Sequence, residues 1–215
     1  MKKKKLKNAL VASGMLLLFA VWTVLIKVVD VKAIGPLGST VGFAELNGFM
    51  HDLTGVNMAL YTLTDWLGLI PMTVMLGFAV LGLAQLIARK DLKRVDRSIV
   101  VLGIFYAIVA AVYVLFEIYP INYRPVLIYG QLEASYPSST TLLVLCVMPT
   151  FAMQMRERVK NSRLNGCVDF AVAAFCAFMV ICRILSGVHW ISDIIGAFLL
   201  SGGLVKLYQF FVRRK

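Results

Sequence analysis

An arginine, a histidine and an aspartate stand close together near the C-terminal end of a chain that is otherwise largely apolar. Arg183, His189 and Asp193 are separated by six and four residues. On one helix, His189 and Asp193 would share a face, so the carboxylate could accept a hydrogen bond from the imidazole. Such a bond sets the tautomer of the ring, as a nucleophile or a base requires. The spacing indicates an activated histidine, although a structural histidine at a helix end would have the same spacing.

A second arginine lies in a segment that two prolines keep out of helix. Arg124 follows Pro120 and directly precedes Pro125, so its side chain can extend from a rigid loop. Further on, Pro137 is followed by the hydroxyl residues Ser138, Ser139 and Thr140. A helix that begins there has free N–H groups and a dipole that attract an anion, or it is simply N-capped by serine. Two arginines, a helix N-terminus and a carboxylate-backed histidine would together suit a phosphoryl group.

The composition indicates what must position these residues. Apolar residues make up 60% of the 215 residues, charged residues only 15%, and the mean hydropathy is +0.83, outside the range of soluble globular proteins. Several apolar runs reach the length of about 20 residues that a transmembrane helix needs. We predict an all-α polytopic membrane protein, one domain over residues 1–215, with six transmembrane helices in a single bundle. The predicted spans are 9–29, 66–88, 98–119, 138–155, 168–186 and 189–212.

The net charge of +11 is explained by topology. Eighteen of the 22 basic residues fall on one side of the membrane if six spans alternate, and the positive-inside rule makes that side cytoplasmic, with both termini inside. Arg124, Arg183, His189 and Asp193 then belong to the extracytoplasmic face of the cell membrane. The sequence has no clustered aromatics of a nucleic-acid module, so we expect no nucleic-acid partner. The eighteen are Lys2, Lys3, Lys4, Lys5, Lys7, Arg89, Lys90, Lys93, Arg94, Arg97, Arg156, Arg158, Lys160, Arg163, Lys206, Arg213, Arg214 and Lys215.

Residues 31–65 form the longest predicted external segment. Phe43, Leu46, Phe49, Met50 and Leu53 recur there at helical spacing. The segment is either an amphipathic helix on the outer leaflet or a loop packed over the bundle. The first span could also be a cleaved signal peptide, but its long apolar stretch and the absence of a small-residue cleavage site favour a retained helix.

These motifs resemble those of the type-2 phosphatidic acid phosphatases, a family related to the vanadium haloperoxidases. The family has the motifs Lys-x6-Arg-Pro, Pro-Ser-Gly-His and Ser-Arg-x5-His-x3-Asp on a six-helix membrane core. The third matches as Arg183-x5-His189-x3-Asp193, and the others match in part, within residues 117–193. The resemblance implies that His189 is the nucleophile and Asp193 its orienting residue. It also implies that Arg124, Arg183 and Ser138 hold the phosphate, with Ser139 and Thr140 beside them.

Two positions depart from the family pattern. Glu117 stands where the first motif has lysine, and Thr140 stands where the second motif has its acid histidine. A threonine cannot supply a proton near neutral pH, and a general acid contributes about 10²–10⁴-fold in rate. Glu117 beside a phosphate is a candidate donor in its place.

Three functions remain open at this stage. The first is an integral membrane hydrolase that acts on a lipid phosphate or pyrophosphate. The second is a lipid phosphoryl or head-group transferase, and the third is a pseudoenzyme that binds lipid phosphates. All three have a membrane lipid phosphate and the bilayer as partners, and the resemblance implies neither a metal nor another cofactor. The sequence favours hydrolysis; it specifies neither the lipid nor the oligomeric state.

Overall fold

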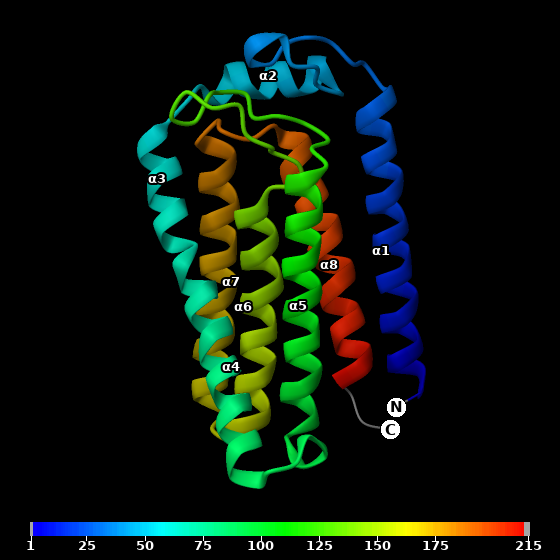
Figure 1. The fold of residues 1–215 in the computed structure, drawn as a ribbon, viewed down its shortest axis with the longest axis vertical. Helices are drawn as coiled ribbons and strands as arrows, with labels where there is room; N and C mark the ends of the chain where they lie inside the picture. Colours follow the sequence, from blue (N-terminus) through cyan, green and yellow to red (C-terminus); the bar gives the residue numbers. More distant parts are fainter. Residues whose placement is uncertain (1, 213–215) are drawn as a thin grey trace.

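The structure, a computed structural model that describes residues 2–212, is a bundle of long helices (Figure 1). Over this range it has no extended strand, only three isolated β-bridges in loops. The all-α polytopic prediction is confirmed. The helices are α1 (Lys2–Val28), α2 (Ala44–Thr54), α3 (Met58–Leu67), α4 (Leu69–Arg89), α5 (Arg97–Ile118), α6 (Ser139–Arg158), α7 (Ser162–Leu185) and α8 (Ile191–Val212), with short 3₁₀ turns at Pro36–Gly38 and Leu92–Arg94.

Five helical segments within the described residues are long and apolar enough to cross a membrane: Lys5–Val28, Met58–Arg89, Arg97–Ile118, Ser162–Leu185 and Ile191–Val212. The remaining long helix, α6, has 20 residues and contacts α4, α5, α7 and α8. Its buried polar residues Thr150 and Gln154 hydrogen-bond to Tyr106 and Tyr208 of neighbouring helices. Protein rather than lipid therefore surrounds much of α6, and the count of six spans stays a prediction.

The second span begins earlier than predicted. Only Gly68 separates α3 from α4, so the apolar segment starts at Met58 rather than at residue 66. The polar residues of α3 hid this start in the sequence because they break the apolar run. The predicted external segment 31–65 therefore contains α2 and most of α3.

Helix α2 lies across one end of the bundle, above the other helices in Figure 1. Within α2, Ala44 and Asn47 are buried, whereas Leu46, Phe49 and Leu53 are exposed. The predicted external segment therefore contains a helix, and its amphipathic role stays a prediction. Contact with a lipid leaflet stays a prediction.

The largest apolar core lies along α8, which packs on α1, α5 and α6. Gly203 allows the close contact with α1, because a Cβ at this position would lie 2.8 Å from the side chain of Leu16. A similar contact at Gly196 admits the ring of Tyr136, which would meet a Cβ at 2.4 Å. These contacts hold α8, and the turn that precedes it, against the rest of the bundle.

Candidate active site

His189 lies in the turn between α7 and α8, not on α8 as the sequence suggested. Gly187 makes this turn possible, since its φ is +64° and a Cβ there would lie 1.8 Å from the carbonyl oxygen of Gly55. On the other side of His189, Trp190 is buried and its Nε1 donates to the carbonyl of Tyr123 at 2.7 Å. The turn therefore holds the histidine ring in a position 5% exposed.

The two ring nitrogens of His189 meet different groups. Nε2 lies 3.1 Å from Nη1 of Arg124, and an arginine can only donate a hydrogen bond. Nε2 therefore accepts, and the ring proton belongs on Nδ1, which lies 3.7 Å from Oδ2 of Asp193. This distance is longer than a hydrogen bond, so the carboxylate faces the ring without bonding to it directly.

The environment keeps His189 neutral. Burial lowers the pKa of His189 well below its usual value, and the positive charges of Arg124 and Arg183 lower it further. A neutral imidazole with its lone pair on Nε2 is the nucleophilic form of the ring.

Asp193 is fully buried in the first turn of α8. Its Oδ2 accepts the backbone N–H of Trp190 at 3.0 Å, and its Oδ1 accepts Nδ2 of Asn122 at 3.3 Å. The first bond closes the helix start in the manner of a capping box. Asp193 therefore also joins the start of α8 to the loop that carries Arg124.

Arg183 is 1% exposed near the end of α7. Its Nη1 donates to Oγ1 of Thr64 at 3.1 Å and its Nη2 to Oγ1 of Thr140 at 2.6 Å. The ring of Tyr61 lies 4.9 Å from the guanidinium carbon. The Nε atom is buried without a hydrogen-bond partner among the described residues, so a donor remains for a ligand.

Arg124 lies in the loop between α5 and α6. Its backbone N–H donates to the carbonyl of Glu133 at 3.0 Å, and its Nε lies 3.0 Å from Oε2 of the same residue. This side-chain contact is an ion pair without the alignment of a hydrogen bond. The ring of Tyr61 also faces Arg124, at 5.7 Å. Tyr61 therefore contacts both arginines.

The start of α6 divides its hydroxyl residues between two environments. Ser138 is fully buried: its hydroxyl donates to Oγ1 of Thr141 and its N–H donates to the carbonyl of Asp193. Ser139 and Thr140 instead line a cavity. The structure therefore places Ser138 behind the cavity wall, where its bonds support the helix start.

This cavity, of about 650 Å³, is formed by α3 to α7 and the loop between α5 and α6. Its polar lining is Asp65, Tyr113, Glu117, Arg124, Glu133, Ser139, Thr140 and Arg183, and its apolar lining includes Leu69, Met72, Met75, Val109, Ala110, Leu142 and Leu143. His189 lies beyond this lining, against Arg124. The cavity thus joins a charged end to an apolar one.

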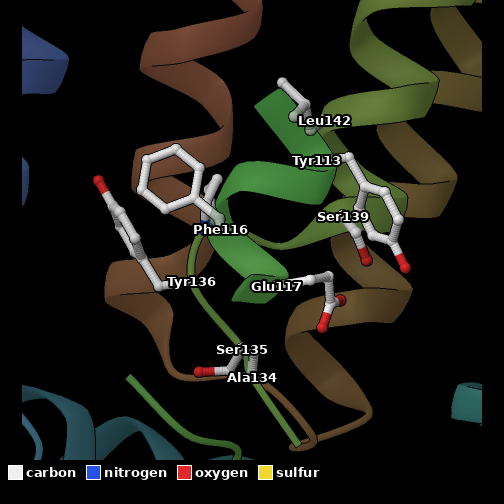
Figure 2. A pocket seen from close by; sticks show the side chains of 9 residues that line it. Tyr113, Phe116, Glu117, Ala134, Ser135, Tyr136, Ser139 and Leu142 are labelled. Carbon is white, nitrogen blue, oxygen red and sulfur yellow. The ribbon is translucent and has the colours of Figure 1, made fainter. Parts of the chain in front are cut away.

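Glu117 lies at the rim, at the end of α5. Figure 2 shows Tyr113, Ser139 and Glu117 with their oxygen atoms in the same region, beside a smaller pocket also lined by Phe116 and Tyr136. Thr140, at the position of the family's acid histidine, holds Arg183 by a hydrogen bond. Within the described residues, no group of three or more His, Cys, Asp and Glu residues could hold a metal ion.

Four residues of the site were missed in the sequence: Tyr61, Thr64, Asp65 and Glu133. The first three lie on α3, so their separation by three and four residues places them together on a helix face. A carboxylate and a threonine inside an otherwise apolar segment was the available signal. Glu133 gave no such signal, because a charged residue in a loop is ordinary.

Comparison with known families and structures identifies proteins that are similar to this chain. Residues 116–215 match the model of the PAP2 superfamily. The fold resembles the crystal structure of a transmembrane PAP2-type phosphatidylglycerolphosphate phosphatase from Bacillus subtilis, with a TM-score of 0.65 and 16% sequence identity over 94% of this chain and 98% of that chain. No curated protein sequence matches significantly. Residues 116–215 therefore carry the match to the PAP2 superfamily, and the shared fold supports the resemblance to the type-2 phosphatidic acid phosphatases.

Proposed function

We propose that the protein is a lipid phosphatase in which His189 takes the phosphoryl group from a lipid phosphate or pyrophosphate. One observation carries this proposal: the buried, neutral His189 presents Nε2 to Arg124, and Arg124 lines the large cavity. A phosphate that replaces this contact would lie between the nucleophile and two guanidinium groups.

The reaction has two steps. Nε2 of His189 bonds to phosphorus as the bond to the leaving oxygen breaks, and Arg124 and Arg183 stabilise the charge that develops on the other oxygens. The imidazole then carries the added positive charge, which the carboxylate of Asp193 offsets at Nδ1. Water next attacks the phosphohistidine, which releases phosphate and restores neutral His189.

The leaving oxygen needs a proton in the first step unless it belongs to a phosphate. Thr140 cannot supply it, because a hydroxyl is too weak an acid near neutral pH. A lipid pyrophosphate avoids this need, since its leaving group is itself a phosphate. Glu117, at the cavity rim, is the alternative donor for a monoester.

The lipid character of the substrate is supported by the cavity walls. Met72, Met75, Val109, Ala110 and Leu143 line the cavity along α4, α5 and α6, away from the arginines. A lipid could place its phosphate at the charged end and an acyl or prenyl chain along these residues. We further propose that this end of the bundle faces the extracytoplasmic side, from the distribution of basic residues.

Phosphate release from purified protein tests the function. We expect release from at least one member of a panel of lipid monophosphates and pyrophosphates, and loss of that release in His189→Ala. Arg156→Ala, on the opposite end of the bundle, is the matched control and should retain activity. Full specific activity of folded His189→Ala would refute the nucleophile assignment.

A second function, lipid-phosphate binding without turnover, is favoured by one contact. Arg124 Nη1 hydrogen-bonds the lone pair that would attack phosphorus. If this contact persists with lipid bound, His189 cannot react. Tight binding of the same lipids, dependent on Arg183 and without phosphate release, would establish this alternative.

A further inference from the structure

A second, basic pocket lies at the end of the bundle opposite α2, where the loop between α4 and α5 meets the ends of α6 and α8 (Figure 1). It has a volume of about 570 Å³, and its charged lining is Lys93, Arg94, Asp96, Arg97 and Glu157. The three basic side chains are exposed. A concave surface lined mainly by one sign of charge attracts ligands of the opposite sign.

Much of this positive charge is free of carboxylates. Among the side chains that the structure describes, Lys93 and Arg97 have no carboxylate within ion-pair distance, and Arg94 meets only an exposed one at 3.9 Å. Asp96, in contrast, is already paired at 2.8 Å with an arginine outside the lining. Three cations therefore face one uncommitted carboxylate, Glu157, so the pocket can accept an anionic group from outside the protein.

An apolar groove between α4 and α5 is adjacent to this pocket, because Val95 lines both. The groove has a volume of about 690 Å³, and its one polar side chain, Tyr106, directs its hydroxyl to Thr150 inside the bundle. A Cβ at Gly103 would meet no atom within 4 Å, so the space beside α5 is open at this level. An apolar ligand of considerable length can therefore lie there.

The groove matches the depth of one membrane leaflet. Ile99 and Ala110 of α5 both line it, and the helical rise of about 1.5 Å per residue places them about 16 Å apart. Half of a hydrocarbon core of about 30 Å is about 15 Å. Leu76 and Leu83, on the α4 wall, are exposed, as expected for a surface that contacts lipid. The groove thus suits acyl chains from the leaflet at this end of the bundle.

We propose that a diacyl phospholipid with an anionic head group binds at this place, with its head group at Lys93, Arg94 and Arg97 and its chains in the groove. Charge complementarity selects the anionic lipid, because basic pockets between transmembrane helices bind anionic head groups and each Lys or Arg near the membrane surface strengthens the attraction. The site goes beyond the proposed function: its head group lies at the end of the bundle opposite His189, and its ligand is retained rather than hydrolysed.

Native mass spectrometry of the purified full chain tests the head-group pocket. Phosphatidylglycerol and phosphatidylcholine with identical acyl chains are titrated separately; both are phosphodiesters, so neither has a terminal phosphate to release. We expect phosphatidylglycerol to bind about tenfold more tightly, with a preference that falls as ionic strength rises. The combined substitutions Lys93→Gln, Arg94→Gln and Arg97→Gln should remove the preference.

A matched control removes three charges from the same end of the bundle but outside the pocket. The combined substitutions Arg156→Gln, Lys160→Gln and Arg163→Gln alter exposed residues at the junction of α6 and α7, and they should preserve the preference. A general effect of net charge would instead reduce it equally in both triple variants, which would overturn the head-group site.

A second pair of variants tests the groove. Gly103→Leu places a side chain in the open space of the groove without meeting protein atoms, and it should weaken the binding of both lipids about three- to tenfold by displacing apolar contact. Gly14→Leu on α1, where a Cβ also has no neighbour within 4 Å, should leave binding unchanged. Unaltered binding in Gly103→Leu would overturn the placement of the chains.

Three further outcomes would overturn the proposal. Equal affinity for the two lipids would remove the anionic selectivity. Binding of phosphatidylglycerol that depends on Arg183 and not on the basic pocket would place the lipid at the phosphate site instead, since Met75 and Ala110 line both the groove and the large cavity. A native dimer that becomes a monomer in Gly103→Leu would assign the groove to a second copy of the chain. None of these measurements requires phosphate release, so they are independent of the test of the proposed function.

Discussion

Arginine and aspartate occur at both ends of the bundle, but their environments differ. At the end where α1 begins and α8 ends (Figure 1), Arg89 and Asp96 form an exposed ion pair of 2.8 Å, and Arg156 pairs with Asp169 in a similar exposed position. At the other end, Arg183 and Asp193 are buried. Exposed pairs contribute about 0–1 kcal/mol each, whereas a buried charge costs several kcal/mol to desolvate.

The desolvation of buried charges therefore lowers the stability of the fold at the site end and not at the basic end. At the basic end, charge can be exchanged with little effect on the fold. At the site end, each buried charge needs specific partners, as Arg183 has in Thr64 and Thr140. Substitutions of the same type at the two ends should therefore have different consequences.

The largest contrast should appear in chemical labelling. Tyr129, which is 94% exposed in the loop of Arg124, is a suitable reporter for the site end. In a Cys167→Ser background, a cysteine at Tyr129 should react fully with an impermeant thiol reagent in intact cells. A cysteine at Asn161, near the basic end, should react only after the membrane is opened. The reverse pattern would overturn the proposed orientation.

A large effect on catalysis is expected from Asp193→Asn. The amide has no charge to offset the one that His189 gains, and it can favour the wrong tautomer, so turnover should fall about 10³-fold or more. The amide oxygen can still accept the N–H of Trp190, so the protein should fold. The comparison is with Asp169→Asn at the basic end, expected within about twofold of the native rate. Equal losses in turnover per folded molecule for Asp193→Asn and Asp169→Asn would mean that the two ends do not differ in their contribution to catalysis.

A smaller effect is expected from Arg183→Lys. Lysine keeps the charge but loses the planar fork that reaches Thr64 and Thr140 together. We expect KM for a lipid phosphate to rise about 10- to 100-fold. Arg156→Lys should leave KM unchanged. A lower melting temperature with unaltered KM for Arg183→Lys would instead indicate a purely structural arginine.

Much of the fold could be predicted because apolar runs in lipid leave few alternatives to helices. The predicted helix boundaries were wrong where the apolar pattern of the sequence was weak. Residues of α3 between Met58 and Asp65 were assigned to the external segment because polar side chains interrupt the apolar run, although Thr64 and Asp65 face Arg183. Burial by neighbouring helices, which explains the polar residues of α6, cannot be read from one segment.

The candidate site also has features that could be predicted from the sequence and features that could not. The spacing of Arg183, His189 and Asp193 was sufficient to bring them together in prediction. It could not reveal that Gly187 places His189 outside α8, or that Asp193 accepts the N–H of Trp190. These depend on a long-range approach of Gly55 and on backbone geometry at one turn. Motif spacing thus predicted the candidate residues, whereas the ring tautomer of His189 and the hydrogen-bond partners of Asp193 depend on the folded geometry.

The smallest expected effect concerns the charge state of His189. Burial is the main cause of its lowered pKa, and the charges of Arg124 and Arg183 add to it. A lowered pKa means that the ring stays neutral as the pH falls below the usual histidine value, so the acid limb of the rate profile should lie below pH ~6.5. Arg124→Gln removes one positive charge and should raise the pKa of His189, moving protonation to higher pH while burial still holds it below the usual value. Nitrogen NMR of labelled histidine, with His51 as the internal reference, measures this shift, and Arg156→Gln at the basic end should produce none. A pKa that is unchanged in Arg124→Gln would show that the contact between Nη1 and Nε2 does not persist in solution, which would also free the lone pair of His189 for attack.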